Sequence, residues 1–284
     1  MLLRGCLLAV AVLLVACEQS AIPDNKIGQQ KVQRIVSLAP HVTELIFAAG
    51  AGDRLVGVVE YSDFPPAAKD IRSVGDAFRI DYESLEVLQP DLVIGWASGN
   101  PPEMIARIRE LGFRVVLVDA QSLDEIAGQL ETIGALTATA GQADKRAAEI
   151  RQQFAELRSA PAGRQKSTVF WQISAEPYYT ITGQHVLNEV IEMCGGKNIF
   201  ADLDGMAASV TLESILVREP DVIIAAVHPV NDSWQESWLR WTQLEAISRR
   251  QLYSVDSDLV SRPGPRLVAG AAEVCKALAQ AAKN

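Results

Sequence analysis

One phrase of this sequence occurs twice, and the repeat constrains the fold more than any other feature. Residues 82–96 read YESLEVLQPDLVIGW, and residues 212–225 read LESILVREPDVIIA. Aligned without a gap, the two phrases pair Glu83 with Glu213, 130 positions apart (213 − 83). Each predicts a short helix that ends before a proline, because the residue before a proline avoids the helical region, and then a buried strand. We therefore expect two similar α/β halves.

Strand and helix patterns alternate in both halves of the chain. Apolar runs of this length are typical of strands covered on both faces, as in a parallel sheet, and the expected strands are 34–38, 55–59, 91–96 and 115–119, then 168–173, 221–227 and 252–256. The helical patterns between them are 42–50, 82–88 and 102–112, then 185–196, 211–217, 234–247 and 266–280.

A stretch of strong helix formers separates the two series. In residues 142–158, apolar side chains recur at helical spacing, and Pro161 and Gly163 follow. The predicted fold class is α/β, with two three-layer lobes of mainly parallel sheets joined by one long rigid helix. The expected parts are an N-terminal lobe at 33–140, a connecting helix at 141–160 and a C-terminal lobe at 161–284.

The N-terminus has the pattern of an export signal. Arg4 precedes an apolar run from Cys6 to Ala16, which is shorter than the roughly 20 residues that cross a membrane. The run ends in LVAC, which resembles a bacterial lipobox, so residues 1–16 are interpreted as a lipoprotein signal peptide and Cys17 as the lipidated residue. Polar residues 17–32 would be the tether. An ordinary signal peptide with an incidental cysteine is the alternative.

Charge and cysteine content restrict the partners and the compartment. The whole chain has 26 basic and 35 acidic residues, and loss of Arg4 with the signal makes it more acidic still, which argues against nucleic acid. Cys6 would be removed with the signal peptide and Cys17 would be lipidated, so Cys194 and Cys275 remain. An oxidising compartment favours a disulfide between them. Two separate buried thiols are the alternative.

Common enzyme motifs are absent, and no histidine stands in a metal-binding spacing. We expect no catalytic residue, no cofactor and no metal site. Of the three histidines, His41 follows the first strand, where ligands meet α/β folds, whereas His185 and His228 are expected at the surface or at helix caps.

Aromatic residues near strand ends predict a site for a large flat apolar ligand. They are Tyr61, Phe64 and Trp96 in the first half and Phe170, Trp171, Tyr178 and Tyr179 in the second. One of Phe170 and Trp171 must belong to the core, because neighbours on a strand face opposite ways. The loop after the last strand adds polar candidates at Asp258, Arg262 and Arg266, with a solvated loop as the alternative.

From residue 33 to the C-terminus the sequence resembles substrate-binding proteins of ABC importers, in the helical-backbone class (class III) that handles cobalamin, ferric siderophores and haem. The run RIVSLAPHVTELIFAAGAGDRLVGVVEYSDFPPAAKDIRSVGD carries the resemblance to the class. The segments EYSDFPP, DLVIGW, VLVDAQSLDEI and EVIEMCGGKNIF are most similar to the cobalamin-binding members.

The resemblance implies a function and several residue roles. It implies capture of cobalamin or a related corrinoid between the lobes and delivery to an ABC permease dimer. Together with the N-terminal signal, the expected protein is a monomeric, periplasmic, membrane-anchored lipoprotein. Tyr61 and Trp96 would lie against the corrin, and the segment Asp258, Leu259, Val260, Ser261 and Arg262 would contact its amide side chains. Glu83 and Glu213 would pair with permease arginines, and Cys194 and Cys275 match the family's disulfide.

The chain also departs from the cobalamin-binding pattern. Ala77 and Phe78 stand where a pocket tryptophan is often found, so Phe78 is a candidate contact, and Met206, Ala207 and Ala208 replace a second aromatic residue. A haem or ferric-siderophore receptor of the same class stays open, with Tyr61 or His41 as a haem ligand. An anionic siderophore would favour a basic cluster, for which only Arg79, Arg262 and Arg266 are available. An exported enzyme on the same scaffold is the third possibility.

Overall fold

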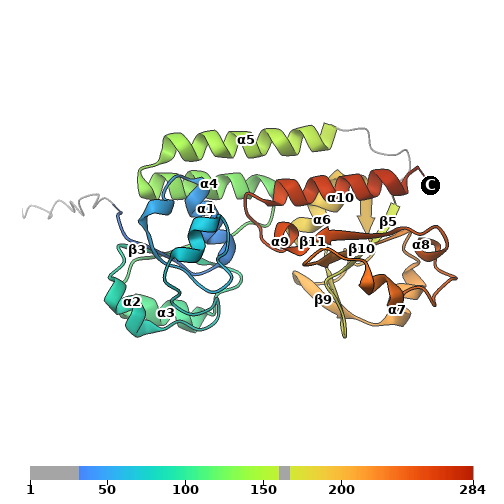
Figure 1. Cartoon of the computed structure of the whole chain (residues 1–284), viewed down its shortest axis with the longest axis horizontal. Helices are drawn as coiled ribbons and strands as arrows, with labels where there is room; N and C mark the ends of the chain where they lie inside the picture. The colour runs from blue at the N-terminus through green and yellow to red at the C-terminus, as the bar shows by residue number, and fades with distance from the viewer. Residues whose placement is uncertain (1–31, 160–166, 284) are drawn as a thin grey trace, which may run out of the picture. The chain divides into compact units, whose positions relative to one another are not determined.

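The computed structural model describes residues 32–159 and 167–283 (Figure 1). The N-terminal lobe is built on a four-stranded parallel sheet. The strand order is β2-β1-β3-β4. The strands are β1 (Ile35–Ser37), β2 (Leu55–Gly57), β3 (Leu92–Trp96) and β4 (Val115–Val118), and the helices are α1 (Pro40–Ala48), α2 (Tyr82–Leu88) and α3 (Pro102–Glu110), with 3-10 helices at Gly52–Arg54 and Pro66–Asp70. All four predicted strands and all three predicted helices are present.

The C-terminal lobe contains a second parallel sheet, ordered β11-β10-β5-β8. Its strands are β5 (Ser167–Gln172), β8 (Gly196–Asn198), β10 (Val222–Val227) and β11 (Leu252–Asp256). Its helices include α6 (Val186–Met193), α7 (Leu212–Arg218), α9 (Ser257–Val260) and α10 (Leu267–Ala281). An antiparallel sheet of β6 (Ser174–Ala175), β7 (Tyr178–Ile181) and β9 (Ala207–Val210), which the sequence analysis missed, lies beside it. The predicted fold class is confirmed.

Two helices connect the sheets rather than one. The sequence analysis predicted the long helix now seen as α5 (Ala140–Ser159) but missed α4 (Leu123–Thr137), whose N-cap Ser122 accepts the backbone N–H of Glu125. Helix α5 packs along α4 and contacts α10 (Figure 1). The buried side chains Ala147, Ile150 and Phe154 form its inner face. Both helices are thus anchored by apolar packing along their length.

The predicted helix at 234–247 is wrong. A 3-10 helix (Ser233–Ser237) and the short α8 (Glu245–Ser248) occupy this region. Trp238 between them is fully buried, packs against Phe170 and donates its indole N–H to Gln172 at 2.8 Å. Tertiary packing of this tryptophan therefore overrides the local helical pattern.

The repeated phrase forms the same local structure in each lobe. Helices α2 and α7 begin at N-caps, Asp81 and Thr211, whose side chains accept backbone N–H groups of the first turn. Both helices end at a left-handed residue, with φ of 43° at Gln89 and 44° at Glu219. The proline that follows each of these residues prevents the helix from continuing.

The aspartate of each phrase ties its strand to the first strand of the sheet. Asp91 Oδ2 accepts the backbone N–H groups of Gln33 and Arg34 at 2.8 and 3.0 Å. Asp221 Oδ2 accepts the backbone N–H of Thr168 at 2.7 Å. The proline and the aspartate of the repeat are therefore parts of the fold.

Phe170 and Trp171 are both buried in the C-terminal sheet, so interpreting either as a ligand contact is wrong. Because both faces of this parallel sheet are covered, strand side chains that point to either face are buried. Cys194 at the end of α6 and Cys275 in α10 form the predicted disulfide across a separation of 81 residues.

Residues from Val32 onward form one compact unit. The exact lobe boundaries at 33–140, 141–160 and 161–284 stay predictions. The predicted signal peptide, Cys17 and all of the tether except Val32 lie outside the described residues. No helix in the described ranges is both long and apolar enough to cross a membrane.

Candidate ligand-binding site

Trp96 is held at the end of β3 by three neighbours. Its indole N–H donates to Asp119 Oδ1 at 3.3 Å, and its backbone N–H donates to Asn100 Oδ1 at 2.6 Å. The ring of His41 meets the indole edge to face, with centroids 5.1 Å apart and an interplanar angle of 86°. The half-buried indole therefore has a fixed orientation while part of it stays accessible.

Asn100 and Gly99 shape the loop around Trp96, and the sequence analysis gave neither a role. Asn100 is buried and donates through Nδ2 to the carbonyls of Leu38 and Ala77 at 3.0 and 2.9 Å. A Cβ on Gly99 would lie 1.9 Å from Cε3 of Trp96. The loop that carries Phe78 is thus tied to the strand end that carries Trp96. The Ser98-Gly99-Asn100 sequence after the strand was the available signal.

Exposed aromatic side chains lie on the neighbouring loops. Tyr61 is 76% exposed and has a left-handed backbone with φ of 63°, and Phe78 is also largely exposed. Phe64 is more covered, because the guanidinium of Arg266 lies 4.4 Å from the centre of its ring. Tyr61 and Phe78 therefore offer free apolar area, whereas Phe64 is already engaged.

The predicted polar segment falls on α9 and the loop that follows it. Asp256 caps α9 by accepting the backbone N–H of Asp258 at 2.9 Å. Val260 is buried in the hydrophobic core, whereas Leu259 is half-buried and Ser261 is exposed. Arg262 Nη2 lies 3.8 Å from Asp258 Oδ1. Ser261 is accessible and Asp258 partly so, whereas the Arg262 side chain is only 13% exposed and Val260 packs the helix onto the lobe.

Two arginines of the C-terminal lobe meet two carboxylates of the N-terminal lobe. Arg262 Nη1 donates to Asp63 Oδ1 at 2.6 Å and to Glu44 Oε1 at 3.3 Å. Arg266 binds the same carboxylate of Glu44 through two donors, at 2.7 and 3.0 Å. The carboxylate of Glu44 is buried, and this paired geometry compensates its loss of water. We call Glu44, Asp63, Arg262 and Arg266 the inter-lobe charge cluster.

Arg262 of the inter-lobe charge cluster contributes to the lowered pKa of two groups, Asp63 and His41. Burial alone would raise the pKa of Asp63, but the hydrogen bond and positive charge of Arg262 hold it below its usual value. Burial, and then the charge of Arg262, lowers the pKa of His41 to about 4. His41 is therefore neutral at physiological pH, with a side chain only 4% exposed.

A cavity of about 860 Å³ lies beside the inter-lobe charge cluster. Its walls come from α1, α5, α10 and the Phe64 loop, and none of the nine predicted ligand contacts lines it. It adjoins the inter-lobe charge cluster through Glu44 and Arg266. Two further candidates from the sequence, Phe64 and Arg266, do line the cavity, whereas Tyr61, Phe78 and Trp96 do not.

The two predicted docking glutamates occupy equivalent exposed positions. Glu83 lies in the first turn of α2, and Glu213 lies in the first turn of α7. One turn further along each helix, Val87 is 71% exposed and Val217 is 82% exposed. Each lobe therefore presents a carboxylate and an apolar side chain on one helical face.

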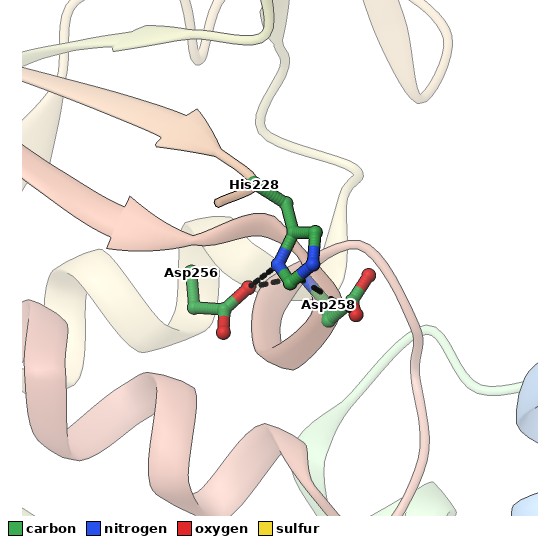
Figure 2. Close-up of side chains that lie close together, drawn as sticks. All are labelled: His228, Asp256 and Asp258. Atoms are coloured by element: carbon green, nitrogen blue, oxygen red, sulfur yellow. Dashed lines mark hydrogen bonds and ion pairs between the residues drawn. The ribbon is translucent and has the colours of Figure 1, made fainter. Parts of the chain in front are cut away.

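The other two histidines lie where the sequence analysis expected them. His185 caps α6, because its Nδ1 accepts the backbone N–H of Leu187 at 3.1 Å. His228 is exposed beyond β10, and its Nδ1 lies 3.1 Å from Asp256 Oδ1 and 3.8 Å from Asp258 Oδ2 (Figure 2). The sequence analysis missed this grouping because strand pairing, not sequence spacing, creates it.

Comparison with known proteins identifies the class: the chain belongs to the periplasmic binding protein family, which it matches over residues 35–259. It is 37% identical to the vitamin B12-binding protein of Vibrio cholerae serotype O1, over 95% of this chain and 98% of that protein. The crystal structure of the periplasmic vitamin B12-binding protein BtuF of Vibrio cholerae superposes with a TM-score of 0.81 at 37% identity, covering 89% of this chain and 99% of that one.

A haem-binding structure also resembles the chain. The periplasmic haem-binding protein RhuT from Roseiflexus sp. RS-1, in its apo form, has a TM-score of 0.74 at 25% identity and covers 88% of this chain and 99% of that one. The fold is therefore shared by a protein named for vitamin B12 binding and a protein named for haem binding.

Proposed function

We propose that this protein captures cobalamin or a close corrinoid between its two lobes and delivers it to an ABC importer. The observation that carries the proposal is the fixed, half-buried indole of Trp96 in the same lobe as the exposed rings of Tyr61 and Phe78. A corrin offers a broad apolar face, which such rings contact at low entropic cost. The 37% identity to a vitamin B12-binding protein supports the same ligand class.

The C-terminal lobe would supply the polar contacts. Asp258, Ser261 and Arg262 present a carboxylate, a hydroxyl and a guanidinium on one short segment, which suits the neutral amides around a corrin. In the ligand-free protein, Arg262 is held by Asp63 and Glu44. Ligand amides would therefore compete with these carboxylates for the guanidinium.

Haem is the second candidate, and the exposed phenol of Tyr61 is the observation that favours it. Haem iron takes a Tyr or His axial ligand. His41 is buried and would have to leave its packing on Trp96 to reach a ligand, so Tyr61 is the better donor. Tyr61→Phe keeps the ring and removes the oxygen, so it separates the two ligands: haem binding should be lost and corrinoid binding retained.

Delivery is assigned to the equivalent helices α2 and α7. Glu83 with Val87, and Glu213 with Val217, give each lobe the same pair of side chains. Two equivalent patches suit a partner that is itself two-fold symmetric, such as a permease dimer with basic groups and apolar pockets. No reaction step is needed for this role, and the protein is proposed to act without catalysis and as a monomer.

Membrane attachment is assigned to Cys17 in the periplasm. Its diacylation would anchor the chain through residues 17–32, since two acyl chains anchor a protein firmly where one is marginal. Cys17→Ser should release the protein from membranes of the cells that export it.

Equilibrium dialysis of the mature protein against cyanocobalamin, haemin and a ferric siderophore tests the choice of ligand. One corrinoid per chain, retained against excess haemin, is the expected result. Retention of haemin or the siderophore without cyanocobalamin would overturn the proposal.

A further inference from the structure

We propose that His228, Asp256 and Asp258 form a binding site for a divalent transition-metal ion such as Zn²⁺ at the carboxyl edge of the C-terminal sheet. The three residues lie on different elements and converge on one point (Figure 2). One ligand atom from each lies within 4.8 Å of the other two. Asp258 is shared with the proposed ligand contacts, but the ion site rests on the grouping of these three side chains and not on the identity of the ligand.

The spacing of the ligand atoms fits a small ion. Zn²⁺ bound to nitrogen and carboxylate oxygen at about 2.0–2.1 Å in a tetrahedral site separates its ligands by about 3.3 Å. His228 Nδ1 lies 3.1 Å from Asp256 Oδ1 and 3.8 Å from Asp258 Oδ2. Small side-chain rotations therefore suffice to place all three atoms around one ion.

The backbone fixes the positions of two of the three ligands, His228 and Asp256. Strands β10 and β11 are parallel neighbours with Val227 opposite Asp256, so His228 emerges one residue beyond that pair. Asp256 is held as the N-cap of α9, and its own backbone N–H donates to Glu273 at 3.1 Å. His228 and Asp256 thus lie at the ends of paired strands, so their backbone loses little conformational entropy when an ion binds.

Asp258 is oriented by a neighbour that leaves one oxygen free. Its Oδ1 faces Arg262 Nη2 at 3.8 Å, while its Oδ2 faces His228. Such outer partners orient metal ligands in known sites. Arg262 is itself shared with Asp63 and Glu44, so its charge does not neutralise Asp256 and Asp258 fully. The group keeps a net negative charge that favours a cation.

The donor set selects the class of ion. One imidazole with two carboxylates favours Zn²⁺ and related first-row ions over Mg²⁺ or Ca²⁺, which prefer oxygen alone. Three protein ligands leave a fourth position open. The His228 side chain is 54% exposed, so this position faces solvent and the ion exchanges freely. A bound ion would also restrain the segment from Asp256 to Arg262.

The test is calorimetric titration of the full mature protein with Zn²⁺, repeated with Asp256→Asn and His228→Ala. Asparagine also caps helices, so Asp256→Asn removes a ligand charge and keeps the start of α9. Asp144→Asn, which alters an exposed residue of α5, is the matched control. Circular dichroism of each variant without metal checks that it is folded.

We expect one Zn²⁺ per chain, an affinity at least tenfold weaker in both site variants, and no change in the control. Co²⁺ bound at the site should give the visible absorption bands of tetrahedral coordination. Added Zn²⁺ should displace Co²⁺ and abolish these bands. Absence of Zn²⁺ binding to the wild-type protein, or equal affinity in the wild type and in folded His228→Ala, would overturn the proposal. If either site variant fails to fold, Asp258→Asn replaces it in the test. Its affinity for Zn²⁺ should also be at least tenfold weaker than that of the wild type, and an equal affinity would overturn the proposal.

Discussion

Arg262 of the C-terminal lobe donates a hydrogen bond of 2.6 Å to Asp63 of the N-terminal lobe. The same guanidinium reaches the buried carboxylate of Glu44, which Arg266 also binds. The lobes are therefore joined by direct charge pairing as well as by α4 and α5. Loss of this contact should therefore lower the stability of the protein.

Replacing Arg262 with methionine should destabilise the protein by about 2 kcal/mol at neutral pH. The change leaves Glu44 buried with one of its two cations and leaves Asp63 without its partner, and disrupted buried pairs are costly. Urea unfolding measures the difference. Arg107→Met, which removes an exposed pair with Glu110, should change stability by less than about 1 kcal/mol. Equal effects of the two substitutions would contradict this account of the inter-lobe charge cluster.

Stability should fall as the pH drops below 6.5. Burial, with the charge of Arg262, lowers the pKa of His41 to about 4, and burial lowers that of His185 to about 4. A depressed histidine pKa means that the unfolded chain binds the proton more readily. The stabilisation is thus complete above the unfolded pKa of 6.5 and is lost as the pH falls toward 4.

The substitution His41→Gln removes the contribution of His41 to the pH dependence of stability and leaves that of His185. Between pH 7.5 and 5, each histidine should account for about 2 kcal/mol of lost stability. The free energy of unfolding of His41→Gln should therefore change by about 2 kcal/mol less over this range than that of the wild type. Identical pH profiles from urea unfolding would show that His41 titrates normally.

Trp96→Ala should weaken binding of cyanocobalamin at least tenfold, because it removes the fixed ring at the end of β3. Trp96→Phe keeps an aromatic face and should lose less. Fluorescence or calorimetric titration measures both affinities. Glu83→Ala is the matched control and should bind as the wild type does. An unchanged affinity in Trp96→Ala would remove this residue from the site.

Docking should depend on both lobes. Glu83→Ala with Glu213→Ala should lower association with the permease, and so should Val87→Asp with Val217→Asp, which places charge on the apolar part of each patch. Each single substitution should have a smaller effect than its pair. Binding of the protein to permease in detergent or nanodiscs measures the association.

Affinity for cyanocobalamin should be the same in these docking variants as in the wild type. A parallel loss of ligand affinity would show that α2 and α7 contribute to the ligand site instead.

The elements that the sequence predicted well are those fixed by local chemistry. The strand 91–96 and the helix 82–88 were predicted from an apolar run and a proline, and the structure reproduces both within a residue. The run 234–247 failed because Trp238 is fixed by Phe170 and Gln172, which lie far away in the sequence. Helix α4 was missed although Ser122 and Glu125 form a capping signal ahead of it.

The candidate site also contains some residues that the local sequence identified and others that it did not. Trp96 was identified from its place at a strand end, but Asn100, Asp119 and Glu44, which position it or its surroundings, were not. Asp119 and Glu44 have partners on another strand end and in the opposite lobe, so no spacing in the sequence records them, whereas Asn100 follows Trp96 by only four residues. Val260 was assigned with its neighbours as a contact, and only the three-dimensional packing shows that its side chain lies in the core.

Calorimetric titration of the ligand-free mature protein with cyanocobalamin tests the central claim most directly. We predict one corrinoid per chain, a dissociation constant of about 1 μM or below, and a negative heat-capacity change, because aromatic surface is buried on binding. No heat of binding at micromolar concentrations with cyanocobalamin, together with saturable binding of haemin, would contradict the assignment.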